Sequence, residues 1–150
     1  MRKWRGRPLP VWLLLAGLIT LGGRAVLGGS LLVLDPSGGA LGLDTAALAG
    51  SPFTDFLVPG VVLTVAIGVL PLVVAVGLFR GRPWSRPGSL LVAVLLVIWV
   101  VVEALDVGVG ERLQYPNLLW ALALAALALA PSVRRVTRDA GGGTANRGSG

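Results

Sequence analysis

Four apolar blocks alternate with polar segments along the chain, and each block has a length suited to a membrane-spanning helix. The blocks run from about Leu9 to Leu34, Phe53 to Phe79, Ser89 to Val109 and Pro116 to Val133. A helix crosses the hydrocarbon layer of a bilayer with roughly 17–25 mainly apolar residues. The pattern therefore predicts an all-α fold over residues 9–133, a four-helix transmembrane bundle with up-down-up-down topology.

Local signals refine the first two blocks and the tail. The first block follows a basic N-terminal segment, residues 1–8, as the apolar part of a signal peptide does. The small-residue motif Ala47-Leu48-Ala49 lies too far beyond this block to be its cleavage site, so we expect an uncleaved signal anchor. Pro59 and Pro71 predict kinks in the second block. The tail, residues 134–150, is charged and then rich in Gly and Ser, which predicts disorder.

The loop between the first two blocks, residues 35–52, is predicted to be ordered. Asp35-Pro36-Ser37-Gly38 is typical of a β-turn, with Pro at its second position. Asp44 suits the N-cap of a short helix over residues 45–49, and Ser51 suits the N-cap of the second span. A long ordered loop is either functional or a lid that packs over the outer mouth of the bundle, and we favour the lid.

Composition narrows the chemistry that the chain can perform. Hydrophobic residues make up 55% of the sequence and charged residues 13%, and Cys and His are absent. The absence of Cys removes disulfides and thiolate nucleophiles, and the absence of His removes the commonest metal ligand and general base. The sequence therefore shows no catalytic or metal site, and we predict no cofactor and no enzymatic activity.

The basic residues predict how the bundle is oriented. Eleven of the 13 Lys and Arg fall in the N-terminal segment, in the loop between the second and third blocks, and in the tail, which four spans place on one side. The positive-inside rule then puts both termini in the cytoplasm of a plasma-membrane protein. The net charge of +6 therefore points to an anionic lipid leaflet as the partner, and not to nucleic acid.

A few polar residues fall within or beside the apolar blocks and form a candidate polar layer. Arg24 and Glu103 both lie about 21–23 Å from the cytoplasmic edge if their helices rise 1.5 Å per residue, which predicts an ion pair between them. Asp106 shares a helix face with Glu103, and Thr64 and Asn117 reach a similar depth. The layer is either a proton or ligand site or a structural device that fixes helix order, and we favour the second interpretation.

Small residues recur every four positions on two of the predicted helices. The second span carries Gly60, Thr64 and Gly68, and the fourth carries Ala121 and Ala125. Such spacing lets helix backbones approach closely. The pattern fits packing inside the bundle and dimerisation equally well.

Three stretches of the chain resemble those of small, uncharacterised four-helix membrane proteins that are common in actinobacteria. They are LDPSGGALGLD at 34–44, SPFTDFLVPG at 51–60 and VIWVVVEALDVG at 97–108, the last with Trp99 and Glu103 in a WxxxE motif. The architecture is also loosely similar to that of DoxX-like proteins. The resemblance implies a four-helix bundle and no known activity.

The sequence leaves three functions open. We prefer a non-enzymatic accessory or scaffold protein that binds another membrane protein, because the chain lacks Cys and His. The alternative is an oligomeric small transporter or channel with Arg24 and Glu103 along a polar path. The third is a membrane enzyme acting on lipid or quinone, with Glu103 or Asp106 as its acid or base.

Overall fold

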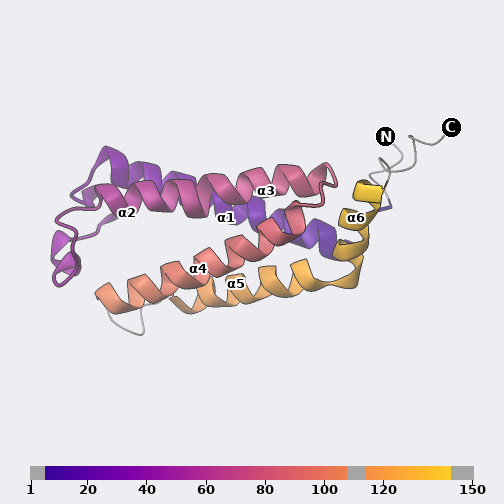
Figure 1. Cartoon of the computed structure of the whole chain (residues 1–150). Helices are drawn as coiled ribbons and strands as arrows, with labels where there is room; N and C mark the ends of the chain where they lie inside the picture. The colour runs from indigo at the N-terminus through magenta and orange to yellow at the C-terminus, as the bar shows by residue number, and fades with distance from the viewer. Residues whose placement is uncertain (1–5, 108–113, 143–150) are drawn as a thin grey trace.

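The chain forms an elongated bundle of helices (Figure 1). The structure, a computed structural model, describes residues 6–107 and 114–142. Its α-helices are α1 (Leu9–Leu34), α2 (Leu57–Val62), α3 (Leu70–Phe79), α4 (Ser85–Val107), α5 (Gln114–Leu129) and α6 (Pro131–Gly142). A π-helical segment, η3 (Leu63–Val69), joins α2 to α3, and two short 3₁₀ helices, η1 (Gly39–Leu41) and η2 (Thr45–Leu48), lie between α1 and α2. The described residues contain no strand, so the predicted all-α class is confirmed.

The helices are long and apolar enough for three or four membrane spans. Three candidate spans are continuous: Leu9–Leu34, Leu57–Phe79 and Ser85–Leu105. The fourth counts as one span only if Tyr115–Leu129 and Pro131–Arg138 are taken together, and these two helices meet at a bend of 57°. The first span has the predicted bounds, whereas the fourth helix ends before the predicted Val133.

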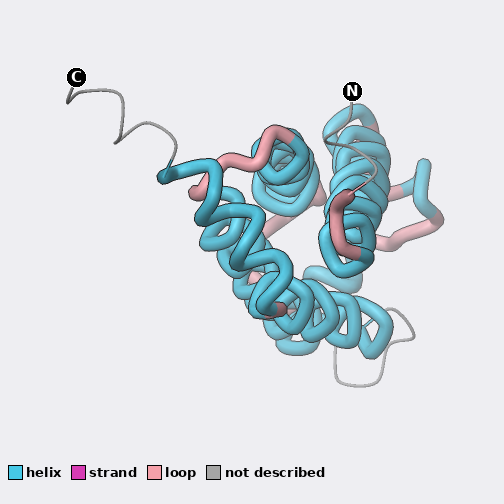
Figure 2. Tube along the Cα trace, turned by 90° about the vertical axis from the view of Figure 1, so that its right-hand side faces the viewer, coloured by secondary structure: helices cyan, strands magenta, loops and turns pink. Residues whose placement is uncertain are grey.

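The helices pack as two long pairs that meet along part of their length. One pair is α1 against the continuous helix α2–η3–α3, and the other is α4 against α5 (Figure 1). Contacts of α3 with α4 and of α1 with α5 join the pairs. Figure 2 shows α6 turned across the bundle axis instead of continuing α5. We call the two ends of the bundle the α6 end and the loop end.

Leucine, valine and alanine side chains from all the long helices form the main core. Its fully buried members include Leu14, Leu18, Leu78, Leu96 and Leu124. A second, smaller cluster at the loop end joins Leu32 of α1 to Leu48 of η2 and to Phe56. The loop is therefore packed against the bundle through Leu48.

Glycines allow α1 and the α2–η3 helix to approach backbone to backbone. A Cβ atom built on Gly68 would lie 3.0 Å from the backbone nitrogen of Val26, and one on Gly60 would lie 3.1 Å from the carbonyl oxygen of Gly29. These distances are shorter than most real Cβ contacts. Packing inside the bundle thus explains the small-residue spacing predicted at Gly60 and Gly68.

The prolines of the second span do not divide it into separate helices. Pro59 lies in the first turn of α2, where its missing N–H has no partner within the helix. Before Pro71 the helix widens into η3, and Leu70 donates its N–H to the carbonyl of Val65, five residues earlier. Such π-helical turns adjust the register of a helix locally. The second span thus contains a π-helical segment before Pro71 and continues as one candidate span, and the predicted kinks stay a prediction.

The loop end is ordered largely as the sequence predicts. Gly38 donates its N–H to the Asp35 carbonyl over 3.0 Å, which closes the predicted turn. The Asp44 carboxylate accepts a hydrogen bond of 2.9 Å from the N–H of Ala46 and caps η2. Hydrogen bonds from the Ser37 hydroxyl and the Ala40 N–H hold the pKa of the Asp35 carboxyl below its ordinary value.

The start of the second span was predicted wrongly. The helix begins at Leu57, and Asp55 accepts a hydrogen bond of 3.0 Å from the Leu57 N–H. Ser51 does not cap this helix, because its hydroxyl donates to the Leu48 carbonyl over 2.9 Å and accepts from the Phe53 N–H. The apolar residues that follow Ser51 therefore belong to the loop and its small core.

The disorder predicted from residue 134 is wrong as far as Gly142, because α6 extends to that residue. Val133 and Thr137 are buried against the bundle, while Arg134, Arg135 and Arg138 are exposed. Buried residues at this spacing form one face of an amphipathic helix. The remaining predicted tail, residues 143–150, lies outside the described residues.

Candidate functional site

Arg24 is a charged side chain at the middle of an apolar helix. It is the sixteenth residue of α1, which has 26 residues, and it is exposed on the surface of the bundle. Its guanidinium carbon lies 5.8 Å from the centroid of the Trp120 ring, on α5. This geometry is a cation–π contact, for which Trp is the best aromatic partner. The contact stabilises the charge while leaving its hydrogen-bond donors available.

Trp120 also fixes the distance between α5 and α1. Its indole Nε1–H donates to the carbonyl oxygen of Gly17 over 3.3 Å. Gly17 and Arg24 are two helical turns apart, so they lie on the same face of α1. A Cβ atom on Gly17 would lie 3.0 Å from the Leu124 side chain, so the glycine permits this close approach. Arg24, Trp120 and Gly17 form what we call the Arg24 site.

Glu103 has a different tryptophan as its partner. The Trp99 Nε1–H donates to the Glu103 carboxylate over 2.8 Å, within α4. The two residues are four apart and therefore share a helix face. Both side chains are half-buried. The WxxxE motif is thus a hydrogen-bonded pair on one helix.

The ion pair predicted between Arg24 and Glu103 is not formed between these two described residues. Arg24 contacts Trp120, and Glu103 contacts Trp99. The physical reason is which helices are neighbours in the bundle. Helix α1 packs mainly against η3, α2 and α3, whereas α4 packs mainly against α5. Similar distances along their helices therefore do not place the two charges side by side.

The other residues of the predicted polar layer have separate positions. Thr64 donates its hydroxyl to the Gly60 carbonyl over 2.8 Å, within its own helix. Asn117 is half-buried near the start of α5, and the Asp106 side chain lies outside the described residues. A polar layer that joins all five residues therefore stays a prediction.

Two arginines at the α6 end act as helix caps, which the sequence analysis did not foresee. Arg7 donates to the Phe79 carbonyl over 2.6 Å at the end of α3 and also lies over the Phe79 ring. Arg86 donates to the Ala128 carbonyl over 3.2 Å at the end of α5. Cations at helix C-termini complement the helix dipole. Each of these arginines lies near the start of a helix in the sequence. The sequence does not show which distant helix end each one contacts.

The described part of the chain contains no candidate metal site. No three or more His, Cys, Asp or Glu side chains come together there in a group that could hold a metal ion. Comparison with protein-family models, with curated proteins and with solved structures gives no match to this chain. The resemblance to small actinobacterial four-helix proteins therefore stays a prediction.

Proposed function

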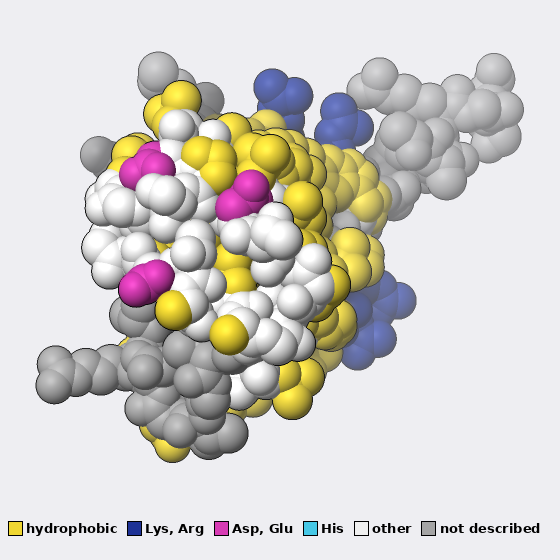
Figure 3. Space-filling model, turned by 90° about the vertical axis from the view of Figure 1, so that its left-hand side faces the viewer, with side chains coloured by type: hydrophobic (Ala, Val, Ile, Leu, Met, Phe, Trp, Pro, Cys, Tyr) yellow, Lys and Arg dark blue, Asp and Glu magenta, His cyan; other side chains and the backbone are white. Residues whose placement is uncertain are grey.

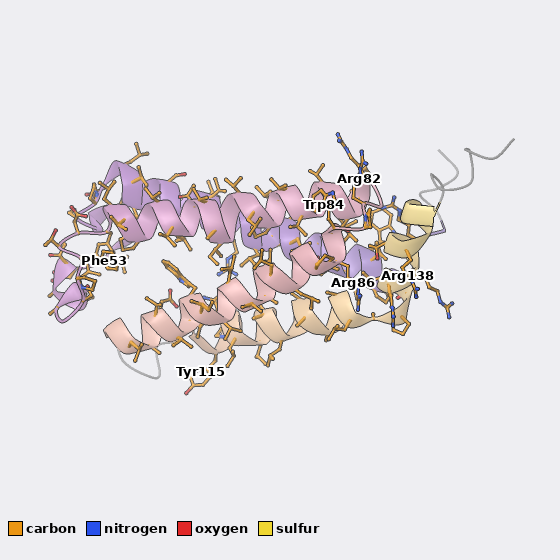
Figure 4. All side chains as sticks on the ribbon, in the orientation of Figure 1. Phe53, Arg82, Trp84, Arg86, Tyr115 and Arg138 are labelled. Carbon is orange, nitrogen blue, oxygen red and sulfur yellow. The ribbon has the colours of Figure 1, made fainter. Side chains whose placement is uncertain are left out.

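We propose that this chain is a four-span plasma-membrane protein with both termini in the cytoplasm, acting as a non-enzymatic accessory or scaffold protein. The distribution of charge supports the orientation. Figure 4 labels Arg82, Arg86 and Arg138 at the α6 end, and Phe53 and Tyr115 toward the other. Figure 3 shows acidic side chains on the loop end, with Lys and Arg further back. The basic α6 end is the cytoplasmic one by the positive-inside rule.

The exposure of Arg24 is the observation that carries the accessory function. A guanidinium within a membrane span is costly, about 2.5–3.5 kcal/mol at the helix centre and less toward the interface. The Trp120 ring offsets part of this cost, since a cation–π contact contributes about 0.5–2 kcal/mol. A neighbouring helix that offers a carboxylate or carbonyl oxygens would offset the rest. Arg24 thus marks the face of α1 at which another membrane protein docks.

The alternative is an oligomeric transporter or channel, and one observation favours it. Arg24 is exposed and Glu103 accepts its hydrogen bond from a neutral tryptophan, so neither charge is neutralised by the other within one copy. In an oligomer these charges would meet across copies and line a shared polar path. The two proposals differ in whether the neighbour of Arg24 is a different protein or a second copy.

A photo-crosslinking amino acid placed beside Arg24 tests the proposal. Leu27 is 70% exposed and lies one turn from Arg24, and Ile19 is 54% exposed, about two turns before Leu27 and about 140° around the axis of α1 from Arg24. With the crosslinker at position 27 we expect an adduct with one different membrane protein, which Arg24→Leu abolishes. The same crosslinker at position 19 is the matched control and should give no such adduct. An adduct with a second copy would favour the transporter, and no adduct at either position would contradict both.

A further inference from the structure

A surface groove at the α6 end combines arginines with an apolar face. It has a volume of about 360 Å³ and lies between α3 and the segment that connects α3 to α4. Its lining residues are Val73, Val76, Gly77, Arg80, Arg82 and Trp84. Figure 4 shows Arg82 and Trp84 close together at this end of the bundle. We call this feature the Arg80–Trp84 groove.

The end of α3 holds the two arginines of the groove in a fixed turn. Gly81 has a φ of 71°, a left-handed conformation that favours glycine. The Arg82 N–H donates to the Gly77 carbonyl over 2.8 Å, and the Gly81 N–H donates to the Leu78 carbonyl over 3.0 Å. This pair of bonds is a Schellman motif, which ends a helix in a defined geometry. Arg80 and Arg82 therefore flank one rigid residue.

A glycine also positions the aromatic side of the groove. A Cβ atom on Gly77 would lie 2.7 Å from Cζ2 and 2.8 Å from Cζ3 of Trp84. The indole ring thus rests directly on the backbone of α3, in a place that no larger residue at position 77 would allow. Half of the Trp84 surface remains exposed, at 46%. Tryptophan is enriched at this depth, where membrane meets water.

Arg80 and Arg82 differ from Arg7 and Arg86 in having no structural task. Arg7 and Arg86 are occupied as helix caps. Within the described residues, the side chains of Arg80 and Arg82 make no hydrogen bond or ion pair, and both are exposed. Guanidinium groups bind phosphate oxygens through paired N–H donors. Two available guanidinium groups beside one turn suit a single phosphate group.

We propose that the Arg80–Trp84 groove binds one anionic phospholipid. Arg80 and Arg82 hold the headgroup phosphate, Trp84 contacts the glycerol region, and an acyl chain lies along Val73 and Val76. These valines are 50% and 51% exposed on α3 and lie within the membrane span. A soluble phosphate would use the arginines but not this apolar face, so the groove suits a lipid. The inference rests on the proposed placement of the chain in a membrane.

Native mass spectrometry of the protein in dodecyl maltoside, with added dioleoylphosphatidylglycerol, tests the site. We expect one tightly retained lipid, and dioleoylphosphatidylcholine should be retained much more weakly. Arg80→Gln/Arg82→Gln should weaken phosphatidylglycerol retention about 10- to 30-fold, through the loss of two arginine–headgroup interactions. Arg134→Gln/Arg135→Gln is the matched control, because it removes the same charge from exposed positions of α6. It should change retention by less than about twofold, since these side chains lie outside the groove.

A further variant and a competition experiment could also contradict the proposal. Trp84→Ala retains both arginines and should also weaken phosphatidylglycerol retention, because the groove loses one side. Equal losses in the two double variants would mean diffuse charge attraction and would overturn the site. Competition by inorganic phosphate as effective as that by phosphatidylglycerol would mean a soluble-anion site and would also overturn it. The assay in micelles does not depend on orientation or on Arg24, so its failure would leave the crosslinking result unaffected.

Discussion

Trp120 has two tasks that one smaller side chain could not combine. Its ring face meets the Arg24 guanidinium, and its Nε1–H reaches the Gly17 carbonyl of the same helix. The ring face carries negative electrostatic potential, while the N–H edge carries positive potential. One indole thereby contacts a cation and a carbonyl oxygen that lie two turns apart on α1. The stabilisation of the Arg24 charge and the packing of α1 on α5 should therefore depend on the same residue, Trp120.

A double-mutant cycle should find that Arg24 is coupled to Trp120. We expect Arg24→Ala and Trp120→Ala to show a coupling free energy of about 0.5–2 kcal/mol, the range of a cation–π contact. The measurement is reversible unfolding in mixed micelles with increasing SDS. Arg24→Ala and Glu103→Ala form the control cycle and should be additive within about 0.3–0.5 kcal/mol, because the two side chains do not touch. Strong coupling in the control cycle and none in the first would contradict these contacts.

The sequence identified the charged residues of this region but not their neighbours. Counting residues from the start of each span gave Arg24 and Glu103 similar depths, which helix rise alone determines. Which residues meet at that depth depends on the order of helices around the bundle, and apolar periodicity does not contain that order. A tryptophan such as Trp120, among Leu and Ala on the fourth span, was the available signal.

Two adjacent glycines of α1 show how closely this helix approaches the second span. A Cβ atom on Gly22 would lie 2.7 Å from the Leu72 side chain and 2.8 Å from the Gly68 carbonyl oxygen. A Cβ atom on Gly23 would meet nothing within 4 Å. The two residues are adjacent in α1 and lie at nearly the same height in the bundle. They therefore differ only in which face of the helix they occupy.

Alanine should therefore have opposite effects at these two positions. Gly22→Ala should lower the free energy of unfolding by about 1–3 kcal/mol, because the added methyl group overpacks the contact between the helices. Gly23→Ala should leave it unchanged or raise it by up to about 1 kcal/mol, since alanine favours the helix over glycine. Unfolding in mixed micelles measures both. Equal losses at the two positions would contradict the close approach of α1 to η3.

At the level of elements, the sequence was reliable where the apolar pattern ends abruptly. The first span ends at Leu34 because Asp35 and Pro36 follow, and the structure ends α1 there. It was less reliable where apolar residues continue outside the membrane helix, as at Phe53, which packs beside the small core of the loop. It also missed α6, whose buried Val133 and Thr137 are few among charged residues.

The separation of charge between the two ends of the molecule makes the proposed orientation directly testable. The chain contains no cysteine, so single cysteines can be introduced without a background signal. In intact cells, a membrane-impermeant maleimide should label Ala46→Cys, at an exposed position of the loop end. Arg138→Cys, on the exposed face of α6, should be labelled only after the cells are permeabilised. The reverse pattern would contradict the proposed orientation, and labelling of both in intact cells would contradict the placement of the loop end and the α6 end on opposite sides of the membrane.

At the level of the whole molecule, the sequence predicted helical content and the number of apolar blocks. It could not decide how the fourth block crosses a bilayer, because Pro131 allows either a straight or a bent path. The structure has a bend of 57° at this point, which leaves the count at three spans or four. The bend follows from burial of one face of α6 against the bundle, a tertiary contact that no local pattern specifies.

That bend has a consequence for the membrane itself. The first helix has 26 residues and α5 has 16, which correspond to lengths of about 39 Å and 24 Å. A hydrocarbon layer is about 30 Å thick, so one side of the bundle is longer than the layer and the other is shorter. In the proposed membrane placement, lipids beside α5 would compress toward the plane of α6, while those beside α1 would not. In this proposed placement the protein would therefore impose a local thickness gradient on its bilayer, and it would be most stable where the membrane already has such a gradient.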